Sequence, residues 1–529
     1  MSKVTRIAAA AAVLTLSLAG ARAETPPDTL VIADKIDDIV NIDPAESFEF
    51  SGNDLLNNTY DTLVEFDPAD LGPLVPGLAT SWSVADDGVT YTFTLRDDVT
   101  FHSGNPVTAE DAAFSLQRAV KLNKTPAFIL TQFGFTPENV EETIKATGDH
   151  ELTIVVDKPY APSFFYSALT AIVASVVDKQ EVLAHEVEGD LGYEWLKTHT
   201  AGSGAYALRE WRPNEGYVLE ANPDYWRGAP AMKRVFVRHV PEPATQRLLL
   251  ERGDVDIARK LTPVDIAGIA DNADLKVDDE LRGLIQYVAL NQTKPPLDNP
   301  KVIEAIKYLI DYDGMANSFL KGSYVVHQSF LPSGFLGAID DKPYSYDPEK
   351  AKALLEESGV GPISVTIFVR NDQDRLEMAQ SFQNSLTEAG IDAKIRTGTG
   401  KEILGEYRSR NHDIYLGAWG PDYSDPHTNA DTFAKNPDNS PEAQLTGVLA
   451  WRNAYPATEE TPITEAAVLE MDTDKRVAMY EELQRIHQQK SPFAPMFQQI
   501  QQVASQKGVE GFSTGGSIHS AFYWPVTKN

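Results

Sequence analysis

The chain has no cysteine among its 529 residues. This absence excludes disulfide bonds, zinc ribbons, iron–sulfur clusters and thiol nucleophiles. Basic residues are few, because 46 Lys and Arg stand against 77 Asp and Glu, which gives a net charge of −31. A chain this acidic repels nucleic acid and anionic membranes, so neither is expected as a partner. The composition, 42% hydrophobic and 23% charged, is that of a globular protein with material for two or more domains.

Several motifs of catalytic sites are also missing. The HExxH, GxGxxG and P-loop patterns do not occur. One S-x-x-K tetrapeptide, from Ser318 to Lys321, stands without the S-D-N and K-T-G elements that accompany a catalytic Ser–Lys pair. The sequence therefore does not predict an enzyme, and an exported hydrolase is the alternative from another class of protein.

A dense group of potential metal ligands lies within twenty residues. Its members are His412, Asp413, Asp422, Asp425, His427 and Asp431. Their spacing fits no named metal site, and metal binding requires ligands that converge in space. A structural metal therefore remains only an alternative, and neither a metal nor a cofactor is predicted.

The first 23 residues have the pattern of a signal peptide. A basic start is followed by an apolar run at residues 7–18 and by a small-residue cleavage site that ends at Ala23. The run of 12 residues is shorter than the roughly 20 that a membrane-spanning helix needs. Cleavage before Glu24 removes three bases and no acid, so the net charge becomes −34. No cysteine is available for a lipid anchor, and we expect a soluble protein of the periplasm.

Helical and strand patterns alternate along the rest of the chain. Residues 89–95 alternate apolar and polar side chains, as a half-buried strand does. Thr108 and Asp111 form a capping box before an apolar stripe, and Asn299-Pro300 begins another helix. A further helix is expected to end at Gly390. The class is therefore mixed α/β, and the absence of long linkers suggests lobes joined by short crossovers.

Several segments together resemble the family 5 extracellular solute-binding proteins, which are peptide, nickel and opine receptors of bacterial ABC importers. The matching segments are NIDP at 41–44, NTYDTLV at 58–64, the long stretch 78–116, GSGAY at 202–206, NPDYW at 222–226, the stretches 291–310 and 346–359, WGPDYSDP at 419–426, and the stretch 476–487. The family pattern at the fourth of these is G-T-G-P-Y, so Ser203 and Ala205 are departures from it. The resemblance covers nearly the whole chain after the signal peptide.

This resemblance implies a two-lobed clamp of the type II-like, large periplasmic-binding-protein cluster, with an additional α/β domain inserted in lobe one. Lobe one is expected to be discontinuous. The predicted boundaries are 1–23 for the signal peptide, 24–64, 200–284 and 495–529 for lobe one, 65–199 for the inserted domain, and 285–494 for lobe two.

The resemblance also implies a function. We expect a monomeric periplasmic receptor that captures a small peptide or an amine-bearing, peptide-like solute and delivers it to the membrane subunits of an ABC permease. An opine, a chelated metal or an oligosaccharide remain alternative ligands, and a sensor or chaperone-like role on the same fold remains open. The two lobes would close by a hinge motion, since a ligand that touches both lobes favours the closed state.

The predicted anchor for the ligand is Asp422. In the peptide-binding branch of the family, an Asp in a W-x-x-D-[YN] segment pairs with the free amine of the ligand, and Asp422 holds this place after Trp419 and Gly420. A carboxylate in a closed cleft is costly unless it is paired, so it favours a cationic group. Trp419 and Tyr423 provide aromatic faces for stacking or cation–π contact. The alternative is that Asp422 is a turn residue beside core aromatics, and Asp425 is expected to form the turn itself.

Three further residues are candidates for the pocket. Arg370 follows an apolar strand, and in dipeptide receptors an Arg at a similar place grips the carboxylate of the ligand with its forked guanidinium. Phe48 and Glu49 lie where the family's first strand leads into the cleft. They are expected to line a pocket that combines apolar walls with few polar anchors.

Overall fold

The computed structural model describes residues 25–67, 70–515 and 521–529. The predicted signal peptide, residues 1–23, lies outside the described residues. The main sheet has eleven strands in the order β15-β14-β16-β12-β17-β11-β1-β10-β9-β8, with β13 paired to β17. The protein is therefore mixed α/β, as predicted.

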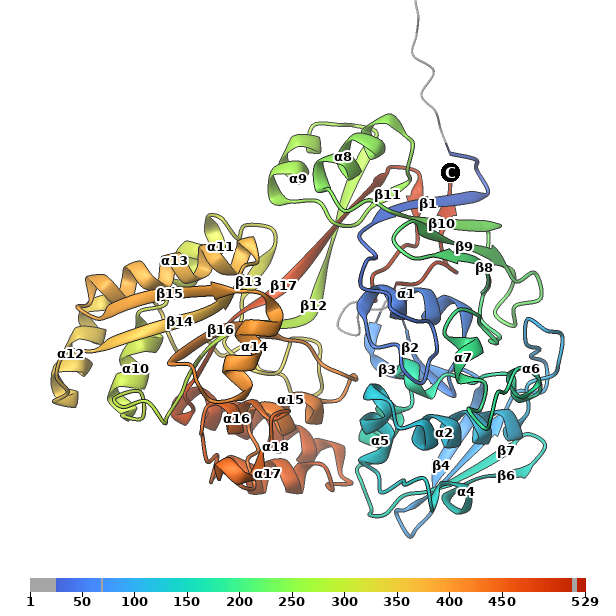
Figure 1. The fold of residues 1–529 in the computed structure, drawn as a ribbon, viewed down its shortest axis with the longest axis horizontal. Helices are drawn as coiled ribbons and strands as arrows, with labels where there is room; N and C mark the ends of the chain where they lie inside the picture. The colour runs from blue at the N-terminus through green and yellow to red at the C-terminus, as the bar shows by residue number, and fades with distance from the viewer. Residues whose placement is uncertain (1–24, 68–69, 516–520) are drawn as a thin grey trace, which may run out of the picture.

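One end of this sheet belongs to the first lobe, which lies to the right in Figure 1. We call this part lobe one. Its strands are β1 (Thr29–Asp34), β8 (Tyr206–Arg212), β9 (Gly216–Ala221), β10 (Arg234–His239) and β11 (Ile257–Ala258), and β18 (Val509–Glu510) pairs with β19 (Thr527–Lys528) in a small separate sheet. Its helices are α1 (Phe50–Thr59), α8 (Pro243–Arg252) and α9 (Pro263–Ile269).

The opposite end of the sheet belongs to lobe two, to the left in Figure 1. Its strands are β13 (Tyr324–Val326), β14 (Ser364–Arg370), β15 (Asp392–Gly398) and β16 (Ile414–Trp419). Its helices are α10 (Pro300–Tyr308), α11 (Tyr312–Asn317), α12 (Pro348–Ser358), α13 (Gln373–Glu388), α14 (Gly400–Arg408), α15 (Pro426–Phe433), α16 (Leu449–Arg452), α17 (Glu460–Ala467) and α18 (Thr473–Lys490).

Two long strands run through both lobes and connect them (Figure 1). They are β12 (Leu275–Leu290) and β17 (Phe493–Gln506), and they pair antiparallel from Leu275 opposite Gln506 to Ala289 opposite Phe493. The register shifts between Leu281 and Ile285, where the pair passes from one lobe to the other. An irregularity of this kind bends and twists a strand pair locally, and we call β12 and β17 the hinge strands. The predicted boundaries after residues 284 and 494 fall within these two strands and stay predictions.

A third unit extends below lobe one in Figure 1, and we call it the extra domain. Its strands are β2 (Val64–Asp67), β3 (Asp70–Pro76), β4 (Ala79–Val84), β5 (Thr90–Leu95), β6 (Ile144–Gly148) and β7 (Glu151–Val155), which form a two-stranded sheet and a four-stranded sheet in the order β4-β5-β7-β6. Its helices are α2 (Ala109–Leu122), α3 (Phe128–Thr131), α4 (Val140–Thr143), α5 (Pro162–Ala168), α6 (Lys179–Ala184) and α7 (Tyr193–Leu196).

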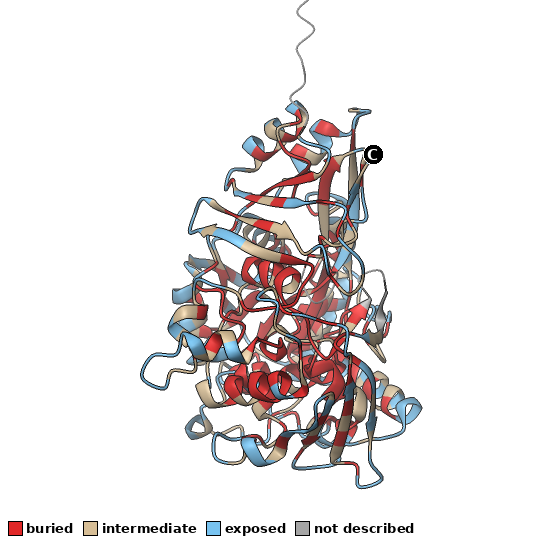
Figure 2. Cartoon of the chain, turned by 90° about the vertical axis from the view of Figure 1, so that its right-hand side faces the viewer, coloured by how far each residue is buried: buried red, intermediate tan, exposed pale blue. Residues whose placement is uncertain are grey.

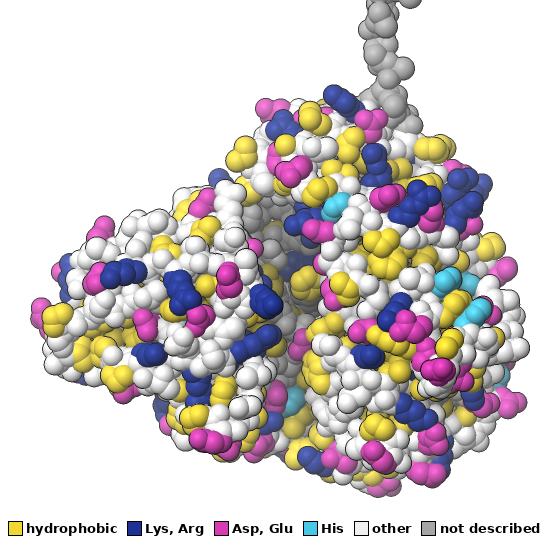
Figure 3. Space-filling view, viewed as in Figure 1, with side chains coloured by type: hydrophobic (Ala, Val, Ile, Leu, Met, Phe, Trp, Pro, Cys, Tyr) yellow, Lys and Arg dark blue, Asp and Glu magenta, His cyan; other side chains and the backbone are white. Residues whose placement is uncertain are grey.

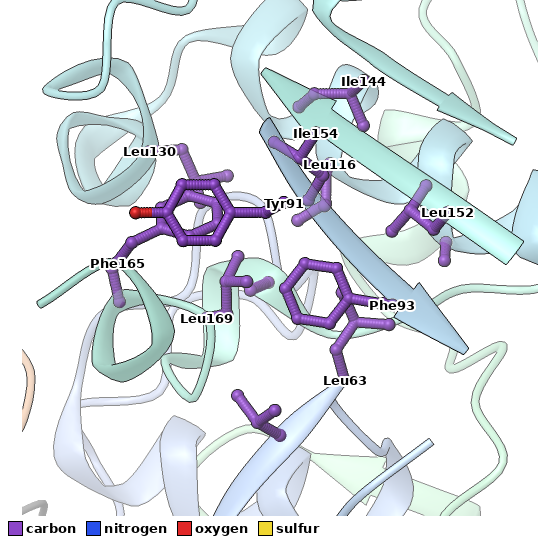
Figure 4. Close-up of a cluster of buried hydrophobic side chains, with 14 of the residues drawn as sticks. Leu63, Tyr91, Phe93, Leu116, Leu130, Ile144, Leu152, Ile154, Phe165 and Leu169 are labelled. Atoms are coloured by element: carbon purple, nitrogen blue, oxygen red, sulfur yellow. The ribbon is translucent and has the colours of Figure 1, made fainter. Parts of the chain in front are cut away.

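The local patterns explain these elements. Tyr91, Phe93 and Leu95 of β5 are all buried, as the alternation predicts, and Figure 4 shows Tyr91 and Phe93 among the apolar side chains of the extra domain. The capping box of Thr108 and Asp111 begins α2 with both reciprocal hydrogen bonds. Figure 2 shows buried residues along the inner helices and strands and exposed residues on the outer loops. In the described part of the chain, no helix is long and apolar enough to cross a membrane.

The extra domain also touches lobe two, away from the hinge. The backbone N–H of Ala161 donates to the carbonyl of Val468 at 2.9 Å, and the Arg476 guanidinium donates to the Ser163 hydroxyl at 2.9 Å. The two lobes are thus connected by the hinge strands at one end and meet through α5 at the other.

Candidate ligand-binding site

Two of the predicted site residues end neighbouring strands of lobe two. Arg370 is the last residue of β14, and Trp419 is the last residue of β16, which runs parallel to β14. Ligands of open parallel sheets bind at this carboxyl edge of the strands. The Arg370 Nε and the Trp419 Nε1 are buried, and neither has a hydrogen-bond partner among the described residues. Both side chains thus have donor capacity at the edge of the sheet where a ligand is expected.

Asp422 follows Trp419 and Gly420 in the loop that leaves β16. Its backbone N–H donates to the Thr428 hydroxyl at 3.1 Å, which fixes the loop on the first turn of α15. No residue of the described ranges hydrogen-bonds or ion-pairs with its carboxylate. Burial raises the pKa of Asp422 to about 7, because desolvation disfavours the charged form. A carboxylate in this state is stabilised by any cationic group that enters.

Asp422 and Tyr423 face residues of lobe one and the extra domain across a small cavity of about 50 Å³. The cavity lies between the lobes, and Figure 3 shows the molecule hollowed along that boundary. Its lining comprises Ser47, Phe48, Asn53, Asn57, Pro126, Ile129, residues 170–173, Pro421, Asp422 and Tyr423. The structure thus brings Phe48, Asp422 and Tyr423 to one cavity, whereas Trp419, Gly420, Arg370 and Glu49 do not line it, and the contact of each with a ligand stays a prediction.

The two aromatic residues of this cavity also have packing partners in the extra domain. Tyr423 is 5% exposed, its ring lies 5.8 Å from that of Phe164, and its hydroxyl donates to Gln132 at 3.4 Å. Phe48 meets Phe128 edge to face, with 6.0 Å between the ring centroids. Their predicted contact with a ligand stays a prediction. In the structure, the Tyr423 ring packs lobe two against the extra domain, and the Phe48 ring packs lobe one against the extra domain.

Glu49 is the N-cap of α1. Its Oε2 accepts a hydrogen bond from the backbone N–H of Phe48 at 3.1 Å. The carboxylate therefore shapes the loop that carries Phe48, and its predicted contact with the ligand stays a prediction.

The predicted turn at Asp425 is the N-cap of α15. Its Oδ1 accepts from the backbone N–H of His427, and both carboxylate oxygens accept from Arg476 at 2.7 Å. Asp425 is therefore paired and buried, whereas Asp422, three residues earlier, is not paired. Among the residues that the structure describes, no three His, Cys, Asp or Glu converge as a metal site would require.

A larger cavity, which we call the hinge chamber, lies beside the crossover strands and has a volume of about 1120 Å³. Residues from both lobes line it, including Lys260 and Arg282 from lobe one and Asp374 and Glu377 from lobe two. The N-terminal half of α1 separates it from the small cavity, because Ser51 and Asp54 face the chamber whereas Asn53 and Asn57 face the small cavity.

Sequence reasoning missed most of the lining of both cavities. Pro126, Ile129 and residues 170–173 carry no distinctive chemistry, so only their position in the fold reveals them. Lys260 and Arg282 are ordinary basic residues in the sequence, and only the strand pairing near the hinge brings them to one chamber.

Neither serine that matches a catalytic pattern lies in a catalytic arrangement. The Ser318 hydroxyl donates to the carbonyls of Gly314 and Met315 at the end of α11. Residues 511–515 (GFSTG) match the G-x-S-x-G pattern, a match that sequence reasoning overlooked. Ser513 pairs with Phe522 in an isolated bridge and is not at the strand-to-helix turn of a nucleophile elbow.

Comparison with known proteins identifies relatives of the whole chain. The family model of "bacterial extracellular solute-binding proteins, family 5 Middle" matches residues 73–441. The probable D,D-dipeptide-binding periplasmic protein of Escherichia coli K12 is 30% identical over 517 residues, which are 97% of this chain and 96% of that protein. The nickel-binding periplasmic protein of the same organism is 29% identical over 73% of this chain and 75% of its own.

Solved structures confirm the predicted fold. The structure of HbpA2 from Haemophilus parasuis has a TM-score of 0.81 at 23% identity and covers 95% of this chain and 100% of its own. The periplasmic binding protein DppA from Helicobacter pylori, in complex with the peptide STSA, has a TM-score of 0.75 at 25% identity and covers 94% of this chain and 98% of its own. The two-lobed clamp is thus shared with proteins of known structure.

Proposed function

Because this chain belongs to the bacterial extracellular solute-binding proteins of family 5, we propose that it is the periplasmic receptor of an ABC importer for a small peptide or another amine-bearing, peptide-like solute. The solute would bind between the lobes and be handed to the membrane subunits of the permease. The relatives named for dipeptides and the peptide-bound neighbour support this ligand class. The predicted signal peptide supports an exported protein.

The unpaired carboxylate of Asp422 is the observation that carries the ligand class. It is half-buried at the small cavity between the lobes, its pKa is raised to about 7, and no described residue pairs with it. An ammonium group would supply the missing partner, whereas a neutral sugar would leave the desolvation of the carboxylate uncompensated. Trp419, with its free Nε1, lies three residues before it and offers an aromatic face.

Arg370 is proposed to receive a carboxylate of the same solute. Its Nε is buried without a partner, and it lies at the carboxyl edge of the same sheet as Trp419. A guanidinium and a carboxylate pair through two parallel hydrogen bonds. A solute with an amine and a carboxylate thus has a counter-charge for each at this edge, which describes a peptide.

Two experiments test this proposal. A native mass spectrum of the purified protein shows whether a solute of this class is retained, and calorimetry with the solute found measures its affinity. In Asp422→Asn the shape is kept and the charge is lost, so we expect affinity to fall by roughly 30- to 5,000-fold, or about 2–5 kcal/mol.

Asp271→Asn is the matched control, because Asp271 is exposed and lines neither cavity. Its affinity is expected to equal that of the wild type. If Asp422→Asn also binds within threefold of the wild type, Asp422 is a turn residue and the solute is a neutral one, such as a sugar. If the protein converts the solute to a product, it is an enzyme, and the proposed receptor function is wrong.

A further inference from the structure

The wall of the hinge chamber that belongs to lobe one has more cationic side chains than carboxylates. Its three cationic groups, Arg259, Lys260 and Arg282, stand against two carboxylates, and Arg259 contacts Asp34 at 3.0 Å and also pairs with Asp54. Lys260 and Arg282 also line the chamber. Within residues 25–67, 70–515 and 521–529, neither has a carboxylate as an ion-pair partner.

Arg282 is buried and Lys260 is exposed, and neither is paired with a carboxylate in the described part of the chain. Arg282 donates to two neutral oxygens, the side-chain carbonyl of Gln501 at 2.5 Å and the backbone carbonyl of Thr514 at 3.4 Å. Burial, together with the neighbouring Arg259, lowers the pKa of Arg282 to about 10. Lys260 is exposed to solvent; Asp34 raises its pKa, but desolvation in the chamber and the charges of Arg259 and Arg282 leave that pKa below its ordinary value. An anion is what would stabilise both charged forms.

The same chamber exposes large apolar side chains. Phe50, Phe319 and Val264 line it and are 52%, 37% and 78% exposed. Apolar surface that faces water inside a cleft gains stability when a ligand covers it. The chamber thus combines apolar walls with a cationic wall, and it lies on the opposite side of the first turns of α1 from the cavity of Asp422.

We infer that Lys260 and Arg282 bind a negatively charged group that the solute carries on an apolar stem, so that this anionic part of the solute occupies the hinge chamber, on the other side of α1 from the cavity of Asp422. This inference rests on the proposed function, since it specifies which peptides that site prefers. In peptide terms, the preferred solute has an acidic side chain in the chamber, after the residue whose amine meets Asp422, and its terminal carboxylate stays with Arg370.

The test compares matched peptides that differ in one charge. Calorimetry is run on trialanine and tetra-alanine, and on the same peptides with Glu or Gln at each position after the first. At one of these positions, the peptide with Glu is expected to bind at least tenfold more tightly than the peptide with Gln, because charge-assisted hydrogen bonds are stronger than neutral ones. Lys260→Gln is expected to remove most of this Glu-over-Gln ratio. Lys342→Gln, an exposed lysine outside the chamber lining, is expected to keep it.

A second measurement does not depend on peptide binding. Glutarate, titrated at constant ionic strength, is expected to raise the melting temperature of the wild type and of Lys342→Gln more than that of Lys260→Gln, and glutaramide is expected to raise none of them. Glutarate supplies the anionic group and the apolar stem without the amine.

The outcomes distinguish a failure of the anion site from a failure of the proposed function. Peptides that bind without a Glu-over-Gln ratio at any position overturn the inference and leave the proposed function. Glutarate stabilisation that needs Lys260, without binding of any peptide, keeps the anion site and overturns the peptide ligand. If Lys260→Gln weakens all peptides equally, Lys260 is a contact to the acidic wall of Asp374 and Glu377 in the closed protein, and the inference is wrong.

Discussion

Two carboxylates three residues apart have opposite environments at the start of α15. Asp425 is held by Arg476 through two hydrogen bonds of 2.7 Å, and its charge is compensated within the protein. Asp422 is half-buried, and desolvation without a partner raises the pKa of its carboxyl. A group that is left uncompensated at a cleft between lobes is a candidate for ligand recognition, because perturbed groups gather at functional sites. The pair of Asp425 and Arg476 is structural.

The raised pKa makes peptide binding depend on pH. The amine pairs with the ionised form of Asp422, and pairing lowers the pKa of that carboxyl, so affinity rises with pH up to the pKa of the free protein, which is about 7. Below it, we expect a loss that approaches tenfold per pH unit. Calorimetry from pH 5.5 to 8.5 measures this slope. The slope is expected to vanish in Asp422→Asn, and an unchanged slope in that variant would assign the titration to another group.

At the scale of elements, the loop after β16 is positioned by helices that are distant in the sequence. Arg476 of α18 reaches the N-cap of α15 through Asp425, the carbonyl of Ala467 at 3.0 Å and the Ser163 hydroxyl of α5. One buried guanidinium thus connects three helices beneath Asp422 and Tyr423. The pair of β12 and β17 works at the same scale, since its register shifts between the segments that belong to the two lobes.

Replacing Arg476 by Met is expected to destabilise the protein by about 3–5 kcal/mol, because it leaves Asp425 buried without its counter-charge. Urea unfolding of lobe two, followed by tryptophan fluorescence, measures the loss. Arg485→Met on the same helix is the matched control, since Arg485 and Asp341 are about half exposed, and a loss below about 1 kcal/mol is expected.

The double variant Arg476→Met with Asp425→Asn tests the reason. It removes both charges, so it is expected to be more stable than Arg476→Met alone. A double variant that is as unstable as the sum of the single ones would attribute the loss to packing of the Arg476 stem.

At the scale of the whole molecule, the lobes meet at the hinge and at α5, with the small cavity and the hinge chamber between them. A ligand that contacts both sides favours the closed arrangement in proportion to its extra affinity for it. Figure 3 shows the hollow that such closure would narrow.

The captured solute is therefore expected to stabilise the protein and to compact it without being consumed. At a concentration 100-fold above the dissociation constant, the gain is ~2.7 kcal/mol. Calorimetric melting measures the gain, small-angle scattering measures the decrease in radius of gyration, and mass spectrometry of the solute measures its recovery. A gain in stability with an unchanged radius would show that binding does not close the lobes.

The sequence alone determined the α/β class, the local elements and the family. Residues 89–95 carry their burial pattern in a period of two, the capping box of Thr108 needs only neighbours within one turn, and the family motifs extend along the chain. These features are local, or are preserved as linear patterns, so they can be read without coordinates. The family match also pointed to Asp422, which the structure leaves unpaired.

Only the tertiary structure decided which groups keep their charges uncompensated. Asp422 and Asp425 look alike in the sequence, and their difference arises because Arg476, some fifty residues later, folds back onto one of them. Lys260 follows β11 and Arg282 lies in β12, and they come to one chamber because both strands pair with β17, while Arg259 pairs with Asp34 and Asp54 from near the start of the chain. Charge compensation depends on distances between segments that are remote in sequence, and those distances are set by the packing of the sheet and its helices.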